Sequence, residues 1–223
     1  MSTKLFVQAI GKFLLGVVLV GVLIFLPAGT VRFFNGWLLM GILFLPMFIA
    51  GIVMMFKNPK LLQSRLSAKE KQKGQGLVVK LSGLMFLTEF ILAGLGVRLG
   101  WYILPKWAAI TASVLFLSAY LLYAEVLREN TYLSRTIQVQ ENQKVVDTGL
   151  YAIVRHPMYS VTLLLFGAMP IVLGSIYSFL VSLIYPFLIV KRIKSEEALL
   201  EKELDGYSDY KKKVKYRLVP FIW

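Results

Sequence analysis

Long apolar segments alternate with shorter polar ones along this chain of 223 residues. A helix needs about 20 predominantly apolar residues to cross a bilayer. Four segments of about that length precede residue 124: 5–26, 36–56, 77–99 and 107–123. Two lysines near the start of the first segment also suit a signal peptide, but no convincing cleavage site follows, so we expect an uncleaved span. The pattern predicts an all-α, polytopic transmembrane helical bundle.

The chain is then almost uninterrupted in apolar character from Pro157 to Val190. A single helix of that length extends about 50 Å, well beyond the roughly 30 Å of a bilayer core. Pro170 and the pair Gly174-Ser175 near the centre favour two antiparallel helices joined by a turn over one long helix. We therefore expect four spans plus a C-terminal helical hairpin, which amounts to five to six membrane segments.

A basic polar segment, residues 57–76, separates the second span from the third. Within it Leu61, Leu62 and Leu66 recur at the spacing of one helix face. Basic residues combined with one apolar face are typical of a helix that lies on a membrane surface. We expect a cytoplasmic loop that contains such a helix.

The remaining polar parts are residues 124–154 and the tail 195–223. The first is expected to begin with a helical extension of the fourth span. The tail predicts two short cytoplasmic amphipathic helices that separate near Asp205-Gly206. Tyr207 and Tyr210 are expected to anchor it at the interface, because tyrosine combines an apolar ring with a polar tip.

Composition supports the membrane interpretation. Hydrophobic residues make up 57% of the chain and the mean hydropathy is +0.69, far above the usual soluble range. The formal net charge of +13 would also suit nucleic acid. However, all of the 25 Lys and Arg except Arg32, Arg98 and Lys106 fall at the end of the bundle that we assign to the cytoplasm. We therefore expect no nucleic-acid partner. Instead we expect the basic residues to be attracted to anionic headgroups of the inner leaflet, and both termini to be cytoplasmic. In a prokaryote the membrane would be the cytoplasmic one.

The chain has no cysteine and one histidine. The absence of cysteine excludes disulfides, thiolate metal sites and cysteine nucleophiles. A His-rich metal site is not expected either, so we predict no metal ligands.

Candidate chemistry gathers at Arg155-His156-Pro157-Met158-Tyr159, where the apolar hairpin begins. Proline suits the first position of a helix. The N–H groups of Met158, Tyr159 and Ser160 are therefore expected to be free, which predicts an anion site beside Arg155 and His156.

The other end of the hairpin returns to the same side of the membrane and carries Arg192 and Glu196. These two residues are four apart and share a helix face. Together with the Arg155–Tyr159 segment they predict a site for a zwitterion, a molecule that carries both an ammonium and a carboxylate.

These motifs resemble the isoprenylcysteine carboxyl methyltransferase family. The resemblance rests on Gly149-x-Tyr151-x-x-x-Arg155-His156-Pro157-x-Tyr159, on Arg192-x-x-x-Glu196-Glu197-x-x-Leu200 and on Tyr207-x-x-Tyr210-x-x-x-Val214. Phospholipid methyltransferases and prokaryotic relatives share this half. The resemblance covers residues 138–223, a C-terminal methyltransferase-like, cofactor-binding region of a single integrated domain. Residues 1–137, the N-terminal transmembrane helices with loop 57–76, resemble the family mainly by topology.

The resemblance implies an S-adenosylmethionine-dependent methyltransferase with a cofactor pocket open to the cytosol. The lipophilic acceptor, an isoprenylcysteine-like or isoprenoid carboxylate or a lipid headgroup, would enter from the membrane. The implied cofactor contacts are Val146, Tyr151, His156, Pro157, Met158, Tyr159 and Glu196. Arg155 and Glu197 complete the expected cofactor-binding set, with a solvated helix face as the alternative for Glu197. Arg192 is implied to hold the acceptor carboxylate and is the expected catalytic residue.

One further residue is a candidate for acceptor binding. Glu89 lies in the middle of the third span, where a carboxylate is costly to bury. It is expected to line the acceptor cavity or, alternatively, to pair with a basic partner. The nearby run Gly94-x-Gly96-x-x-x-Gly100 has the wrong spacing for a dinucleotide loop and predicts close helix packing.

Two other classes of protein remain open. The first is a sterol-reductase-like membrane enzyme that uses NADPH, because small polytopic enzymes of that kind have a similar C-terminal layout. The second is a transporter or a scaffold without catalysis. Transport is disfavoured because the spans lack inverted repeats and a chain of intramembrane polar groups.

Overall fold

The computed structural model describes residues 3–66, 75–101, 103–134 and 136–223, and the described chain is helical throughout its regular elements. The helices are α1 (Thr3–Ala28), α2 (Phe34–Lys57), α3 (Pro59–Leu66), α4 (Gln75–Arg98), α5 (Lys106–Glu129), the short 3₁₀ helix η1 (Gly149–Ala152), α6 (Pro157–Val172), α7 (Ile176–Ser182), α8 (Tyr185–Glu203) and α9 (Tyr207–Lys213).

Five helical segments of the described chain are long and apolar enough to cross a membrane. They are α1, α2, α4, α5 and the nearly continuous pair α7–α8 over Ile176–Glu203. Helix α6 is apolar but shorter. The predicted fold class is therefore confirmed, and the protein is a multi-pass integral membrane protein. The expected extension of the fourth span is also confirmed, because α5 continues to Glu129.

The hairpin prediction is correct as well. Helix α6 ends at Val172 and α7 begins at Ile176, so the apolar run is broken where proline and glycine indicated. Gly174 has φ +76°, and a Cβ there would lie 2.8 Å from Asn35 Nδ2. Its carbonyl accepts a hydrogen bond from the Leu104 N–H at 2.8 Å. This turn therefore needs glycine both for its left-handed backbone and for its close contacts.

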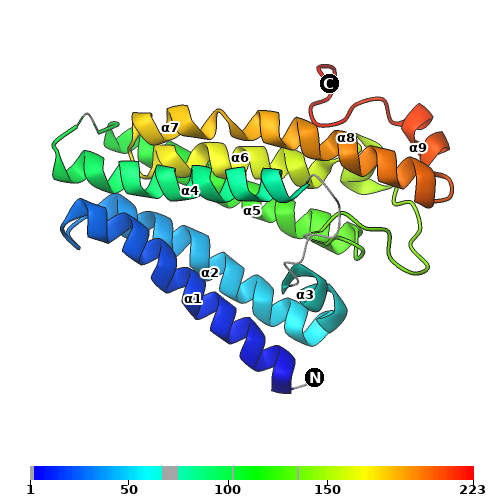
Figure 1. The fold of residues 1–223 in the computed structure, drawn as a ribbon, viewed down its shortest axis with the longest axis horizontal. Coiled ribbons are helices and arrows are strands. Elements are labelled where there is room, and N and C mark those ends of the chain that lie inside the picture. Colours follow the sequence, from blue (N-terminus) through cyan, green and yellow to red (C-terminus); the bar gives the residue numbers. More distant parts are fainter. Residues whose placement is uncertain (1–2, 67–74, 102, 135) are drawn as a thin grey trace.

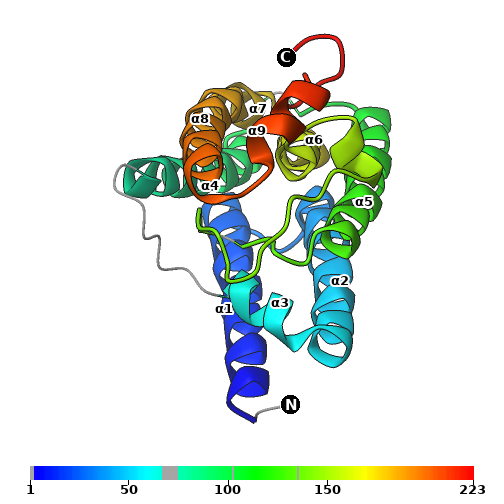
Figure 2. The same ribbon diagram turned by 90° about the vertical axis from the view of Figure 1, so that its right-hand side faces the viewer.

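Helices α4 to α8 lie side by side along the long axis of the molecule, whereas α1 and α2 form a pair that diverges from them (Figure 1). In the view from the end of the bundle, α6 lies between α5 on one side and α4 with α8 on the other (Figure 2). Helices α3 and α9 and both termini lie toward this same end. The motifs at the two ends of the hairpin are thereby brought together here.

Of the glycine run predicted to serve close helix packing, Gly94 does so, whereas Gly96 meets Trp101 and Gly100 lies past the end of α4 with φ +67°. Gly94 and Gly96 lie within the helix rather than in a loop. A Cβ on Gly94 would lie 2.4 Å from the carbonyl oxygen of Ile24 in α1, closer than any real side chain approaches. Helices α1 and α4 therefore pack with their backbones nearly in contact.

The predictions for the polar segments need one correction. The first of the two expected tail helices is not separate, because α8 continues unbroken from the membrane to Glu203. The break falls at Leu204–Gly206, where Gly206 adopts φ +82°, and α9 follows. In segment 57–76, α3 buries Leu61 and Leu62, as the leucine spacing indicated. Residues 67–74 of that segment lie outside the described residues, and its last two residues, Gln75 and Gly76, already belong to α4.

Candidate functional site

A cavity that is partly open to solvent lies at the end of the bundle that carries α9. Its wall consists of segment 130–146, η1, the start of α6 and one face of α8 and α9. The lining residues include Asn130, Leu133, Ser134, Ile137, Val145, Val146, Tyr151, His156, Met158, Tyr159, Arg192, Glu196, Leu200, Leu204, Tyr207 and Tyr210.

One end of the cavity is charged. The Tyr159 hydroxyl donates to Glu196 Oε2 at 2.5 Å, and Arg192 Nε donates to the same hydroxyl at 3.0 Å. The His156 ring stacks on the Tyr159 ring with 5.7 Å between centroids. Arg192 and Glu196 therefore share a helix face, as their spacing predicted, and that face points to the start of α6. A guanidinium and a carboxylate thus lie on either side of one tyrosine hydroxyl.

Apolar side chains also line the cavity. Leu200 of α8, Leu204 just after that helix, and Ile137, Val145 and Val146 belong to the wall, together with the polar residues Gln138, Gln143 and Lys144. Tyr207 and Tyr210 of α9 pack with Leu200, Leu204 and Val145 in one hydrophobic cluster.

Two tyrosines of this wall, Tyr151 and Tyr210, are held by hydrogen bonds. The Tyr210 hydroxyl donates to the Tyr151 carbonyl at 2.8 Å, and Asn130 Nδ2 donates to the Tyr151 hydroxyl at 3.1 Å. Burial raises the pKa of both phenols above the ordinary value, because a phenolate loses its hydration there. Both hydroxyls therefore stay protonated and neutral.

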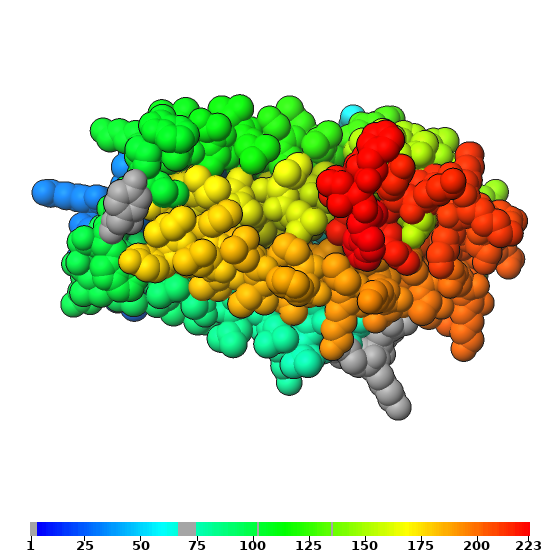
Figure 3. Space-filling model, turned by 90° about the horizontal axis from the view of Figure 1, so that it is seen from above, coloured from blue at the N-terminus to red at the C-terminus, as the bar shows by residue number. Residues whose placement is uncertain are grey.

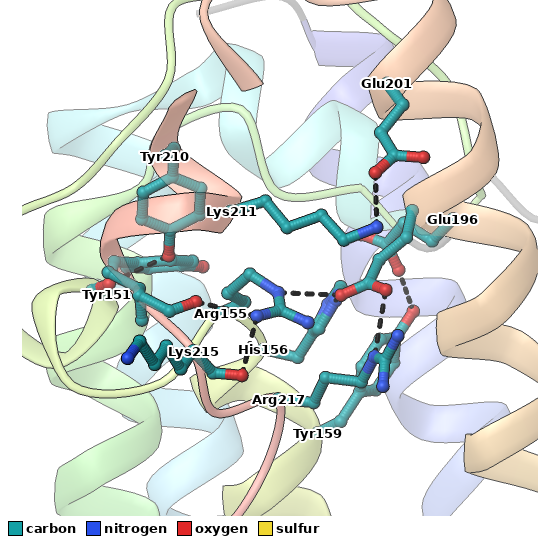
Figure 4. Close-up of polar contacts among 12 residues, drawn as sticks. Tyr151, Arg155, His156, Tyr159, Glu196, Glu201, Tyr210, Lys211, Lys215 and Arg217 are labelled. Atoms are coloured by element: carbon teal, nitrogen blue, oxygen red, sulfur yellow. Dashed lines mark hydrogen bonds and ion pairs between the residues drawn. The ribbon is translucent and has the colours of Figure 1, made fainter. Parts of the chain in front are cut away.

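A buried ion cluster beside the cavity is centred on Glu197, and Figure 4 labels its partners Arg155, His156 and Arg217. Arg155 Nε is 2.8 Å from Glu197 Oε1, and Arg217 Nε is 2.9 Å from Oε2. His156 Nε2 lies 3.3 Å from Oε1. Arg155 Nη1 also donates to the carbonyls of Val214 and Lys215, at 2.6 and 2.8 Å. The cluster therefore joins α6, α8 and the C-terminal segment.

The C-terminal segment lies across α6 and α8 (Figure 3). The backbone N–H groups of Arg155 and His156 donate to the carbonyls of Tyr216 and Arg217, each at 2.9 Å. Ser160 Oγ donates to the Leu218 carbonyl at 2.6 Å. These contacts fasten the tail to the start of α6 and hold the cavity wall in place.

The predicted anion site at the start of α6 is only partly correct. Helix α6 begins at Pro157 as expected. However, the N–H groups of Tyr159 and Ser160 both donate to the His156 carbonyl, at 3.0 and 3.2 Å. A helix leaves only its first N–H groups unbonded, and here the first turn is tightened onto the capping residue. Side chains rather than these backbone groups therefore supply the polar atoms of the site.

The predicted site residues separate into two groups. Those in the cavity wall are Val146, Tyr151, His156, Met158, Tyr159, Arg192 and Glu196. Arg155, Pro157 and Glu197 are not among the wall residues that the structure describes. Glu197 is 4% exposed, so it lies on neither a solvated helix face nor the cavity wall. Its neighbour Glu196 faces the cavity because successive residues on a helix point about 100° apart.

Glu89 lies away from the described wall. Its residue is 1% exposed, and neither carboxyl oxygen has a hydrogen-bond partner among the described residues. Among the described residues, no basic side chain therefore pairs with the Glu89 carboxylate, which contradicts the alternative expectation. The Glu89 carbonyl accepts from Ser178 Oγ of α7 at 2.7 Å, so the residue lies where α4 packs on α7.

Several wall residues were not predicted. Segment 130–146 has no periodic pattern that would reveal which of its residues turn inward. Tyr207 and Tyr210 were expected at the membrane interface, but they are 3% and 6% exposed and line the cavity. The single useful signal was their spacing of three, which places both on one face of α9.

The sequence also did not reveal that α3 contacts this site. Ser64 Oγ donates to the Leu133 carbonyl at 3.1 Å. The Arg65 guanidinium donates to the Ser134 carbonyl at 3.4 Å, to the Tyr123 hydroxyl of α5, and lies 3.7 Å from Met158 Sδ. Leu133, Ser134 and Met158 all belong to the cavity wall. Helix α3 therefore supports segment 130–146 of the cavity wall through these contacts.

Comparison with known proteins agrees with this geometry. Residues 102–202 match the model of the isoprenylcysteine carboxyl methyltransferase (ICMT) family. The match includes α5, η1, α6, α7 and almost all of α8, and hence the whole charged end of the cavity. This segment of the membrane protein is therefore similar to the ICMT family, a family of methyltransferases. No curated protein matches the chain.

Proposed function

We propose that the protein transfers a methyl group from S-adenosylmethionine to a lipophilic acceptor in the membrane. The observation that carries this proposal is the arrangement of Tyr159, Arg192 and Glu196 at one end of the cavity, within the segment that matches a methyltransferase family. This arrangement provides both signs of charge on a helical framework at one end of the bundle.

The residues of the cavity suit S-adenosylmethionine. Glu196 lines the cavity and offers a carboxylate to its ammonium and sulfonium charges. The apolar wall residues Leu200, Leu204 and Val146 suit the faces of a nucleoside. Tyrosine rings in the wall also favour a nearby cation.

When bound, S-adenosylmethionine supplies an electrophilic methyl group. The residues of this chain bind and orient: Glu196 and Tyr159 hold the ligand's charged end, and the apolar wall excludes water from the reacting groups. Displacement at a methyl group requires the acceptor in line with the leaving sulfur, so positioning contributes much of the rate. A carboxylate acceptor needs no general base, whereas an amine or hydroxyl acceptor does.

We assign the acceptor's anionic group to Arg192. An arginine fork suits a carboxylate or a phosphate, and Arg192 is partly exposed on the part of α8 that leads into the membrane-spanning region. The acceptor class is then an amphiphile with an apolar chain and an anionic head, such as an isoprenylcysteine-like carboxylate or a lipid headgroup.

The test is incubation of the purified protein with methyl-labelled S-adenosylmethionine and a membrane lipid extract from its source. We expect one labelled lipophilic product, identified by chromatography and mass spectrometry. Calorimetric titration with S-adenosylhomocysteine and separately with NADPH complements it. Binding of NADPH without S-adenosylhomocysteine would overturn the proposal in favour of a reductase.

A further inference from the structure

The Tyr207 side chain holds a polar atom that the rest of the structure does not explain. The residue is 3% exposed, and its hydroxyl has no hydrogen-bond partner among the described residues. Buried hydroxyls are nearly always bonded, because burial without a partner costs free energy. Burial also raises the pKa of this phenol, so the hydroxyl remains a neutral donor and acceptor.

Tyr210, on the same face of α9, provides an internal comparison. The two rings lie 5.8 Å apart, both residues line the cavity, and both are buried. However, the Tyr210 hydroxyl is satisfied, because it donates to the Tyr151 carbonyl. Its hydroxyl therefore has a structural use, whereas the hydroxyl of Tyr207 has none within the described protein.

The position of Tyr207 indicates which kind of ligand group would use that hydroxyl. It packs with Leu200, Leu204 and Val145, whereas the charged residues Arg192 and Glu196 precede Leu200 on α8. The carboxylates of Glu196 and Glu197 are close enough to act on the Tyr207 phenol, so a further carboxylate is disfavoured there. The apolar neighbours of the ring suit a flat heteroaromatic or sugar group that has apolar faces and polar edges.

We infer that Tyr207 is a binding residue for the nucleoside half of the ligand, and that its hydroxyl forms a hydrogen bond with that half. This inference rests on the proposed function, which supplies a nucleoside-containing ligand. The charged end around Tyr159 then takes the amino-acid half. Ligand binding provides the hydroxyl with the partner that it lacks among the described residues.

Tyr207→Phe tests the inference, because it removes one oxygen and leaves every recorded contact of the ring in place. Binding of S-adenosylhomocysteine and of 5′-methylthioadenosine, which lacks the amino-acid half, is measured by calorimetry on the full-length protein in detergent. We expect the Kd of both ligands to rise by a similar factor of about 3 to 10, the effect of one hydrogen bond. The Tm of the ligand-free variant should be unchanged or higher.

Tyr210→Phe is the matched control. It removes a satisfied hydroxyl and leaves the Tyr151 carbonyl without its donor, so the ligand-free Tm should fall. The opposite response of the two variants would separate a ligand contact from a structural contact.

Unchanged affinity of Tyr207→Phe for both ligands would overturn the inference and leave the proposed function intact. So would a loss confined to S-adenosylhomocysteine, since it would move the hydroxyl to the amino-acid half. Failure of the unaltered protein to bind S-adenosylhomocysteine would instead refute the proposed function, and this inference with it.

Discussion

Arg155 Nε lies 2.8 Å from Glu197 Oε1, and this buried pair joins the start of α6 to the last turns of α8. Both side chains are almost fully buried, at 3% and 5% exposure. Arg217 completes the pair from the C-terminal segment. The two motifs that define the family pattern are therefore tied together by a structural contact next to the cavity rather than by the ligand-facing residues.

Glu197→Gln should destabilise the fold. The substitution leaves the buried guanidinium of Arg155 and the half-buried one of Arg217 without a carboxylate, and breaking a buried ion pair from one side costs about 3–5 kcal/mol. The free energy of unfolding in detergent, or the Tm where unfolding is irreversible, measures the effect.

Glu201→Gln is the control for this prediction, because Glu201 lies one turn further along α8 and pairs with Lys211 on the surface. An exposed pair contributes about 0–1 kcal/mol. Equal stability losses in the two variants would contradict a special role for Glu197.

Arg192→Ala should impair acceptor use more than ligand binding. We expect about a 100-fold lower kcat/KM for the acceptor, since the loss of a charge-assisted contact removes much of its positioning. The Kd of S-adenosylhomocysteine should change less than about 5-fold, because the Tyr159–Glu196 hydrogen bond remains. Lys194 is an exposed cation on the same helix, so Lys194→Ala should leave both the kcat/KM and the Kd unchanged. Comparable losses in these two quantities for Arg192→Ala would refute the assignment.

Arg65→Ala should weaken ligand binding without a contact to the ligand. The guanidinium supports Ser134 and Met158 of the cavity wall, so its removal loosens segment 130–146. We expect the Kd of S-adenosylhomocysteine to rise about 3- to 10-fold. Arg65→Lys should restore part of the affinity, and Lys60→Ala, exposed on the same helix, should have no effect. A wild-type Kd for Arg65→Ala would exclude support by α3.

The orientation in the membrane is testable with single cysteines, because the natural chain has none. Ser208→Cys in α9 should react with a membrane-impermeant maleimide from the cytoplasmic side, in inside-out vesicles. Val31→Cys, exposed between α1 and α2, should react from the opposite side. These expectations follow from the distribution of Lys and Arg. The reverse labelling pattern would invert the proposed topology.

The helices were predictable because their signals are local. Apolar length alone located α1, α2, α4 and α5, and Pro170 with Gly174 located the turn between α6 and α7. The end of α8 was harder to predict. It extends unbroken to Glu203 because nothing before Gly206 interrupts a helix, and a change from apolar to polar residues does not by itself end one.

The direction in which each polar side chain points was not predictable. Glu196 and Glu197 are adjacent and chemically equivalent, yet the first faces the cavity and the second the ion cluster. Tyr207 and Tyr210 also appeared equivalent, and the position of Tyr151 decides which of their hydroxyls is satisfied.

The sequence by itself therefore determined the class of protein, its helical spans and the approach of the Arg155–Tyr159 segment to Arg192 and Glu196. Hydrophobic length, helix-breaking residues and the closure of a hairpin are properties of one stretch of chain, and they act whatever surrounds them. Only the tertiary structure decided which of these charges bind and which hold the fold together. The role of each charge depends on residues from distant segments, such as Arg217 of the tail and Arg65 of α3. Their contacts change the free energy of the polar groups beside them.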